Sequence, residues 1–130
     1  MPTSIDVINL TKRYDFTTAL EAISFQVETG EIMGFLGPNG AGKTTALRIM
    51  AGMIAPTSGT VTIDGIDVTR DPLNVRRRIG YLPEHVALYP ELRVNEYLHY
   101  RARIKGVGRK DRRARVEEAL TYRRPAYRLH

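Results

Sequence analysis

Hydrophobic and polar residues alternate in three short stretches of this chain. Residues 5–10 alternate in part, residues 22–27 alternate throughout, and residues 60–63 form a third stretch that runs into a turn. Alternation with a period of two residues is typical of half-buried β-strands. Thr29 and Gly30 form a turn after the second stretch, so the pattern predicts antiparallel strands joined by hairpins.

Two further stretches are short and continuously apolar. Residues 31–36 and residues 79–83 have this character, and the second ends at Pro83, which cannot donate to a strand ladder. A continuous apolar run of about four to eight residues is typical of a strand that is buried on both faces. We therefore expect buried strands over 31–36 and 79–83.

Helical spacing of apolar residues appears in three places, and a fourth helix is marked by its first residues. In the first of these places, Leu47, Met50 and Ile54 recur at the spacing of one helical face. Asp71 followed by Pro72 is a typical helix start, with an N-cap side chain before a proline at the first helical position. The patterns predict helices over residues 43–52, 72–78, 94–105 and 109–121.

Length and composition fit one small α/β domain. The chain has 130 residues and no cysteine, which excludes disulfides and thiolate metal sites and favours a reducing cytoplasm. No apolar run approaches the roughly 18 to 20 residues that span a bilayer, and we expect no signal peptide. His85, His99 and His130 are scattered and make no metal-ligand spacing.

The net charge of +6 comes entirely from the end of the chain. Residues 1–100 carry nine basic and eleven acidic side chains, whereas residues 101–130 carry eleven basic and three acidic ones. Such a cluster fits either a patch for nucleic acid or anionic membrane, or the solvated faces of polar helices. The second interpretation is favoured, because no aromatic residues are interleaved as in RNA-binding segments. We expect no nucleic-acid partner.

A glycine-rich segment between the 31–36 run and the first predicted helix carries the clearest chemistry. Its spacing, Gly, four residues and then Gly-Lys-Thr, is that of the phosphate-binding loop of nucleotidases. Glycines let successive backbone amides turn inward around phosphate oxygens, and the helix N-terminus adds partial positive charge. The candidate nucleotide-binding residues here are Gly37, Pro38, Asn39, Gly40, Ala41, Gly42, Lys43, Thr44 and Thr45.

Three side chains of this loop have predicted roles. We expect Lys43 to reach the β- and γ-phosphates as a compact cation, and the Thr44 hydroxyl to hold Mg²⁺. Thr45 is predicted to donate to an α-phosphate oxygen. Strand, loop and helix occur in the order that this chemistry needs, so nucleotide binding is the expected function.

The order of these segments resembles the ATP-binding subunit of ABC transporters. Beyond the phosphate loop, the resemblance rests on residues 10–14, on the turn and strand over 56–65, and on residues 79–84 with 88–92, which resemble the Q-loop and the entry to a helical subdomain. It covers about residues 4–120. The resemblance implies an incomplete P-loop NTPase domain of the ABC type, made of an antiparallel β part, the α/β core and the start of the helical subdomain.

The resemblance also implies the remaining ligand contacts. Tyr14 looks like the aromatic residue that stacks on adenine in this family, although a half-buried residue at a strand end is the alternative. Glu84 stands where the family usually has glutamine, and an oxygen at that position would serve Mg²⁺. The expected cofactors are ATP and Mg²⁺.

Partners and location follow from the same resemblance. It implies a second ATP-binding subunit that dimerises across ATP, and a transmembrane transporter subunit that holds the protein at the inner face of the membrane, in the cytoplasm. An exporter-type transporter is favoured by the character of residues 82–84 and 88–90. The expected divisions are a partial ATP-binding core over 1–92, the beginning of the helical subdomain over 93–120 and an atypical tail over 121–130.

Several motifs of the family are not found in the sequence. These are the signature resembling Leu-Ser-Gly-Gly-Gln, the apolar strand ending in Asp-Glu, and the switch histidine. No residue here is therefore a candidate for catalysis, and we expect a shortened chain that cannot hydrolyse ATP alone and whose 31–36 strand lacks partners. The alternatives are a non-catalytic remnant with residual nucleotide or partner binding, and a different P-loop enzyme. The GTPase motifs Asp-x-x-Gly and Asn-Lys-x-Asp are absent.

Overall fold

The computed structural model describes residues 2–38, 40 and 42–122. The chain forms two compact units, Met1–Tyr81 and Leu82–His130. The first holds all the strands and the phosphate loop, and the second holds two helices. Each unit is described by itself.

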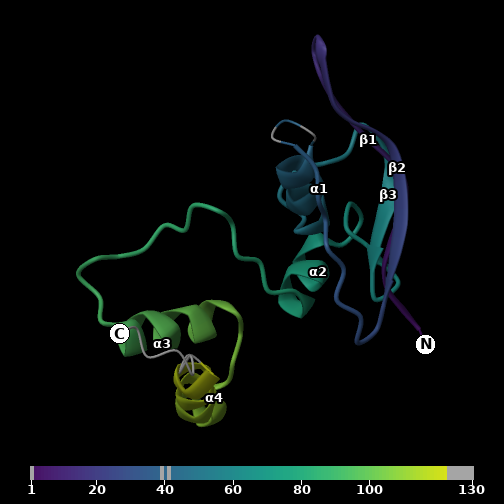
Figure 1. Ribbon diagram of the computed structural model, residues 1–130. Coiled ribbons are helices and arrows are strands. Elements are labelled where there is room, and N and C mark those ends of the chain that lie inside the picture. Colours follow the sequence, from purple (N-terminus) through teal and green to yellow (C-terminus); the bar gives the residue numbers. More distant parts are fainter. Residues whose placement is uncertain (1, 39, 41, 123–130) are drawn as a thin grey trace, which may run out of the picture. The chain divides into compact units, whose positions relative to one another are not determined.

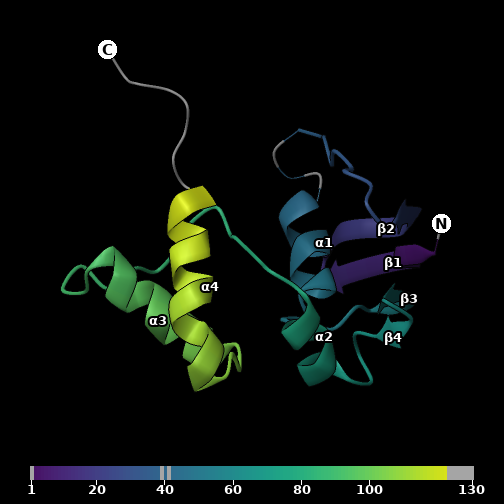
Figure 2. The ribbon, with the colours of Figure 1, turned by 90° about the horizontal axis from the view of Figure 1, so that it is seen from below.

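The first unit is built on a four-stranded antiparallel sheet with the order β2-β1-β3-β4 (Figure 1 shows β1, β2 and β3, and Figure 2 adds β4). The predicted strands over 5–10, 22–27 and 60–63 are confirmed, and two of them are much longer than their alternating cores. Because β1 pairs with β2 on one side and β3 on the other, it is a central strand. The strands are β1 (Thr3–Tyr14), β2 (Thr17–Glu28), β3 (Ser58–Ile63) and β4 (Ile66–Asp67).

Two helices, α1 (Lys43–Met50) and α2 (Pro72–Arg78), pack on this sheet (Figure 2), and the core of the first unit is made of residues from the helices and the strands. Both confirm the predicted helices. Ile49 of α1 and Val75 of α2 are fully buried against strand residues. The core residues are Val7, Leu10, Leu20, Ala46, Ile49, Val61, Ile63, Val68 and Val75. Burial of this set therefore fixes the helix that follows the phosphate loop against β2 and β3.

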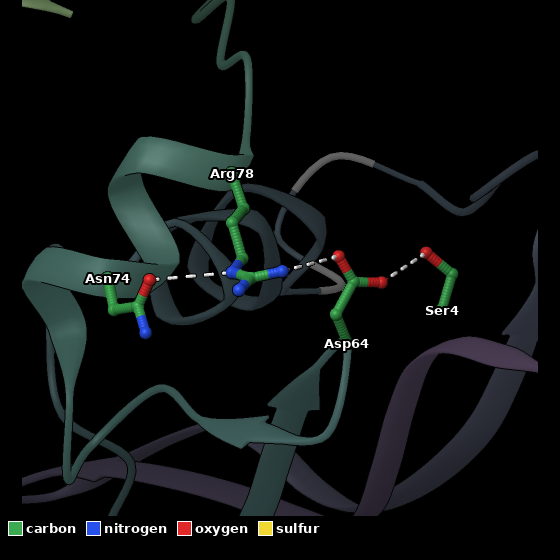
Figure 3. Close-up of polar contacts among 4 residues, drawn as sticks. All are labelled: Ser4, Asp64, Asn74 and Arg78. Atoms are coloured by element: carbon green, nitrogen blue, oxygen red, sulfur yellow. Dashed lines mark hydrogen bonds and ion pairs between the residues drawn. The ribbon is translucent and has the colours of Figure 1, made fainter. Parts of the chain in front are cut away.

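The ends of α2 are held by polar contacts. The carboxylate of Asp71 accepts a hydrogen bond from the backbone amide of Asn74 at 3.3 Å, so Asp71 is the N-cap that the sequence predicted. At the other end, Arg78 lies 3.7 Å from the Asp64 carboxylate, which also accepts from the Ser4 hydroxyl at 3.3 Å (Figure 3). Asp64 belongs to the two-residue turn between β3 and β4, so these contacts connect α2 to the sheet.

The predicted strand over 31–36 is wrong. The structure has no strand between Glu28 and Lys43 in the residues that it describes. Ile32 is 98% exposed and Leu36 is 95% exposed, whereas Phe35 packs on Phe25 with ring centroids 5.6 Å apart. An apolar run becomes a strand only where a neighbour pairs with its backbone, and none of the four described strands does so.

The predicted strand over 79–83 is also wrong, for the same reason. These residues join no sheet of the described chain. Ile79 still packs against the core of the first unit, but Leu82 is 84% exposed. The apolar pattern therefore identified a residue that packs on the core, Ile79, but the residues around it do not form a strand.

The second unit consists of α3 (Val94–Ile104) and α4 (Arg109–Tyr122), which pack on one another. Both predicted helices are confirmed. The Glu96 carboxylate accepts from the backbone amide of Arg93 at 2.7 Å, and the backbone amide of Glu96 donates to Oδ1 of Asn95 at 2.9 Å. The helix therefore begins with satisfied amides at positions 93 and 96, although its N-cap residue is neither Ser nor Thr. Before α3, Tyr89 meets Tyr100 edge to face, and their hydrogen bond raises the pKa of Tyr89.

Across the described residues, no helix combines the length and the apolar character that crossing a bilayer requires. The expected division into a core over 1–92, a subdomain over 93–120 and a tail over 121–130 stays a prediction. Residues 123–130 of that tail lie outside the described residues.

Candidate functional site

The start of α1 has the properties of an anion site. The helix begins at Lys43, and its N-cap is Gly42, so no cap side chain accepts from the first amides. The Ala46 amide donates to the Gly42 carbonyl at 2.9 Å, which leaves the amides of Lys43, Thr44 and Thr45 with no acceptor earlier in the helix. No acidic residue lies in the first turn. No acidic side chain of the first turn therefore offsets the partial positive charge at this helix end.

Gly42 is required at its position by two independent constraints. Its φ of 87° lies in the left-handed region, which is unfavourable for residues with a Cβ atom. A Cβ at this position would lie 2.2 Å from the carbonyl oxygen of Ala19 and 2.5 Å from Cδ2 of Leu20. The loop can therefore approach β2 this closely only because position 42 has no side chain.

A hollow of about 350 Å³ lies where the loop meets the beginning of β2. This volume is within the range of small-ligand sites, about 300 to 1,000 Å³. Four of its lining residues are threonines and one is a lysine, so its lining is rich in side chains that can donate hydrogen bonds to an anion. The lining residues are Thr17, Thr18, Ala19, Gly40, Gly42, Lys43, Thr44 and Thr45.

The Lys43 side chain folds back over its own loop. Its Nζ donates a hydrogen bond to the carbonyl oxygen of Gly37, at the beginning of the loop. A phosphate oxygen is an acceptor of the same kind and carries more charge, so it can replace this carbonyl as the partner of the ammonium group. Lys43 is thus held beside the hollow, where an anion would meet it.

Tyr14 lies at the end of β1 that borders this hollow. In the β1–β2 ladder it is paired with Thr17, one of the lining residues. The tyrosine is 48% exposed, and the Lys12 ammonium group lies 5.2 Å from the centroid of its ring. Tyr14 itself is not one of the lining residues. The structure places it next to a residue that lines the hollow, and its contact with a base stays a prediction.

The sequence profile of the ABC transporter family matches residues 20–126. The chain belongs to the ABC transporter family. The matched segment includes the whole phosphate loop and the helices of both units, and it extends six residues into the 121–130 segment for which the sequence indicated no resemblance. The predicted fold class, an α/β P-loop domain of the ABC type, is confirmed by this match and by the structural similarity below.

Two curated relatives and one solved structure show the extent of the similarity. The ABC transporter ATP-binding protein NatA of Bacillus subtilis is 41% identical over 101 residues, which are 77% of this chain and 41% of NatA. The SkfA peptide export ATP-binding protein SkfE of the same organism is 39% identical over 116 residues, covering 89% of this chain and 48% of SkfE. The chain thus spans less than half the length of these relatives.

The solved structure is a dimeric, post-hydrolysis state of the ATP-binding cassette MJ0796 bound to ADP and Pi. It superposes with a TM-score of 0.77 at 29% identity, covering 90% of this chain and 56% of that protein. This similarity extends the family assignment from sequence to three-dimensional fold.

The structure does not test every predicted site residue. Glu84 lies in the second unit, on an exposed bend, so its contact with a metal stays a prediction. Asn39 and Ala41 lie outside the described residues. No group of three or more His, Asp or Glu side chains that could hold a metal occurs in the described part of the chain.

Three lining residues were missed by the sequence analysis. Thr17, Thr18 and Ala19 face the loop across the hollow, although more than twenty residues separate them from Lys43. The only signal in the sequence is the pair of hydroxyl residues just after Tyr14, and that pair is also common on exposed strands. Their place at the site follows from the pairing of β2 with β1 and its packing against α1, which is non-local.

Proposed function

We propose that this chain binds Mg·ATP as the ATP-binding component of an ABC-type transporter of the exporter kind. The observation that carries the proposal is the hollow at the start of α1, which is lined by four threonines and one lysine and lies beside amides that have no acceptor within the helix, with no acidic residue in the first turn or among the lining residues. Such an arrangement suits a polyphosphate and few other ligands.

Different residues of the loop contact different phosphates in this proposal. Backbone amides of Gly40, Gly42 and the first turn of α1 surround the phosphate oxygens. Lys43 exchanges its Gly37 partner for the β- and γ-phosphates, and Thr45 donates to an α-phosphate oxygen. The roles of Lys43 and Thr45 rest on their position at the hollow.

Magnesium would be held by the Thr44 hydroxyl and, through an oxygen or a water, by Glu84. Mg²⁺ needs few protein ligands, because it keeps waters and takes oxygens from the phosphates. An exposed hydroxyl at the first turn of α1 therefore suffices as an anchor. When bound, the ion neutralises charge between the β- and γ-phosphates.

Tyr14 stacks on the adenine ring in this proposal. A tyrosine face contributes about 1 to 3 kcal/mol when a base stacks on it. The half-exposed ring beside Thr17 offers such a face at the end of β1.

The proposed partners are a second ATP-binding subunit, which would complete the site across a dimer, and a transmembrane subunit at the inner face of the membrane. The dimeric cassette bound to ADP and Pi supports the first partner, and the names of the curated relatives support the second. The export relative SkfE and the character of residues 82–84 and 88–90 favour an exporter.

We propose further that these 130 residues bind ATP without hydrolysing it. The sequence offers no carboxylate at the end of an apolar strand to orient the attacking water. The alternative is a non-catalytic remnant that retains only residual nucleotide or partner binding.

Calorimetric titration with Mg·ATP and Mg·GTP tests the proposal. We expect Mg·ATP to bind, Mg·GTP to bind no more tightly, and Lys43→Ala to abolish both signals, because the loop loses its basic side chain at the phosphates. Lys110→Ala, on exposed α4, is the matched control and should change nothing. A phosphate-release assay should show no turnover, and turnover lost in Lys43→Ala would contradict the binding-only proposal.

A further inference from the structure

Lys12 makes two contacts that connect the predicted base-stacking ring to the segment after the phosphate-loop helix. Its ammonium nitrogen lies 5.2 Å from the centroid of the Tyr14 ring, two residues further along β1. The same nitrogen donates to the carbonyl oxygen of Ala55 at 2.8 Å. Ala55 lies in the connection between α1 and β3, so one side chain joins the ring to the segment that follows the helix.

Two further hydrogen bonds hold the same region together. The Arg13 amide donates to the Thr57 hydroxyl at 2.9 Å, and the Thr57 amide donates to the Thr11 carbonyl at 2.9 Å. The strand on both sides of Lys12 is therefore fixed to the 51–57 connection independently of its side chain. Removing the Lys12 ammonium group should leave the path of β1 intact.

The cation has a specific effect on the ring. A cation over an aromatic face is attracted by the negative charge of that face, which limits the rotation of the side chain. Lys12 lies over the ring of the half-exposed Tyr14, so the contact favours this orientation of the ring while part of its surface stays exposed. A ring that is already fixed loses less conformational entropy when a base stacks on it.

We propose that Lys12 is a positioning residue for nucleotide binding, which holds Tyr14 in the orientation that receives the base. This inference rests on the proposed function of the site. Lys12 contributes nothing to the phosphates in this proposal, so its effect is confined to ligands that have a base.

The test compares two ligands, Mg·ATP and inorganic tripolyphosphate with Mg²⁺, by calorimetric titration of the full chain. Lys12→Met removes the charge, and Lys12→Gln removes the charge but keeps a donor for Ala55. In both variants we expect Mg·ATP to bind about 2- to 5-fold more weakly, the range of an exposed cation–π contact. Tripolyphosphate affinity should be unchanged, Lys12→Arg should restore ATP affinity, and Lys110→Met should have no effect.

A double-mutant cycle with Tyr14→Ala isolates the pair. In the Tyr14→Ala background, Lys12→Gln should no longer weaken ATP binding, because the ring that it positions is absent. Equal losses for ATP and tripolyphosphate, an unchanged or tighter ATP affinity in Lys12→Gln, or additive effects in the cycle would each overturn the inference. Failure of the proposed function is a different result, in which the unaltered chain binds neither ligand or Lys43→Ala binds both normally.

Discussion

Gly42 is the residue on which the geometry of the candidate site depends most directly. It supplies the positive φ at the N-cap of α1 and the space that lets the loop contact Ala19 and Leu20. The sequence pattern identified this glycine as part of a phosphate loop, but only the fold shows that β2 is the element it must accommodate. The conformational requirement and the packing requirement can be separated by experiment.

Replacing Gly42 by alanine should destabilise the fold by more than about 2 kcal/mol. The left-handed conformation alone costs an alanine about 1 to 2 kcal/mol, and the contact with the Ala19 carbonyl forces a backbone shift in addition. Gly30→Ala is the matched control, since Gly30 has a φ of 84° and nothing within 4 Å of a built Cβ. Urea denaturation measures both, and equal losses in the two variants would show that the contact with β2 is unimportant.

At the scale of elements, the burial of one face of α1 in the core fixes the position of the phosphate loop, which precedes the helix. Its buried residues, Ala46 and Ile49, lie on the face that packs against the sheet, while Leu47 is 43% exposed. Because the loop is continuous with the helix, any movement of α1 moves the first-turn amides as well. The stability of the helix and the affinity for phosphate are therefore coupled.

Ile49→Ala should cost about 2 to 5 kcal/mol of unfolding free energy, because it leaves a cavity in the core of the first unit. Leu47→Ala, two residues earlier in the same helix, should change stability by no more than about 0.5 kcal/mol. Chemical denaturation followed by circular dichroism gives both values. A small loss in Ile49→Ala would indicate that α1 is not firmly packed, and the loop geometry would then lose its support.

The accuracy of prediction from sequence also differs between elements, for a physical reason. The start of α2 was predictable because Asp71 and Pro72 act locally on the helix that follows them. The conformation of residues 31–36 was not predictable in this way. Their apolar composition indicates that the segment is suited to burial, but it does not indicate whether a partner strand is present. Lys12 carries no local signal either, since its contact with Ala55 joins positions 43 residues apart.

For the molecule as a whole, the structure leaves large apolar side chains on the surface of both units. Ile32 and Leu36 are almost fully exposed in the first, and Leu82 and Leu88 are 84% and 65% exposed in the second. Exposed apolar residues of this size favour association with another surface. The backbone of residues 31–36 also joins no sheet of the described chain, so it can still pair with a strand from elsewhere.

We therefore expect the isolated chain to be marginally stable and to self-associate through residues 31–36. The variant with Ile32→Lys and Leu36→Lys should stay monomeric at concentrations where the unaltered chain forms larger species, because charges on an unpaired apolar segment oppose strand pairing. Its melting temperature should be unchanged, since both side chains are exposed and outside the core. Sedimentation velocity over a range of concentrations measures the first effect, and calorimetry measures the second.

Leu82→Lys with Leu88→Lys is the matched control, with two equally charged substitutions outside this segment. Equal relief of association by both variants would assign it to general surface hydrophobicity, and a cooperative transition of the unaltered chain above roughly 55 °C would contradict marginal stability.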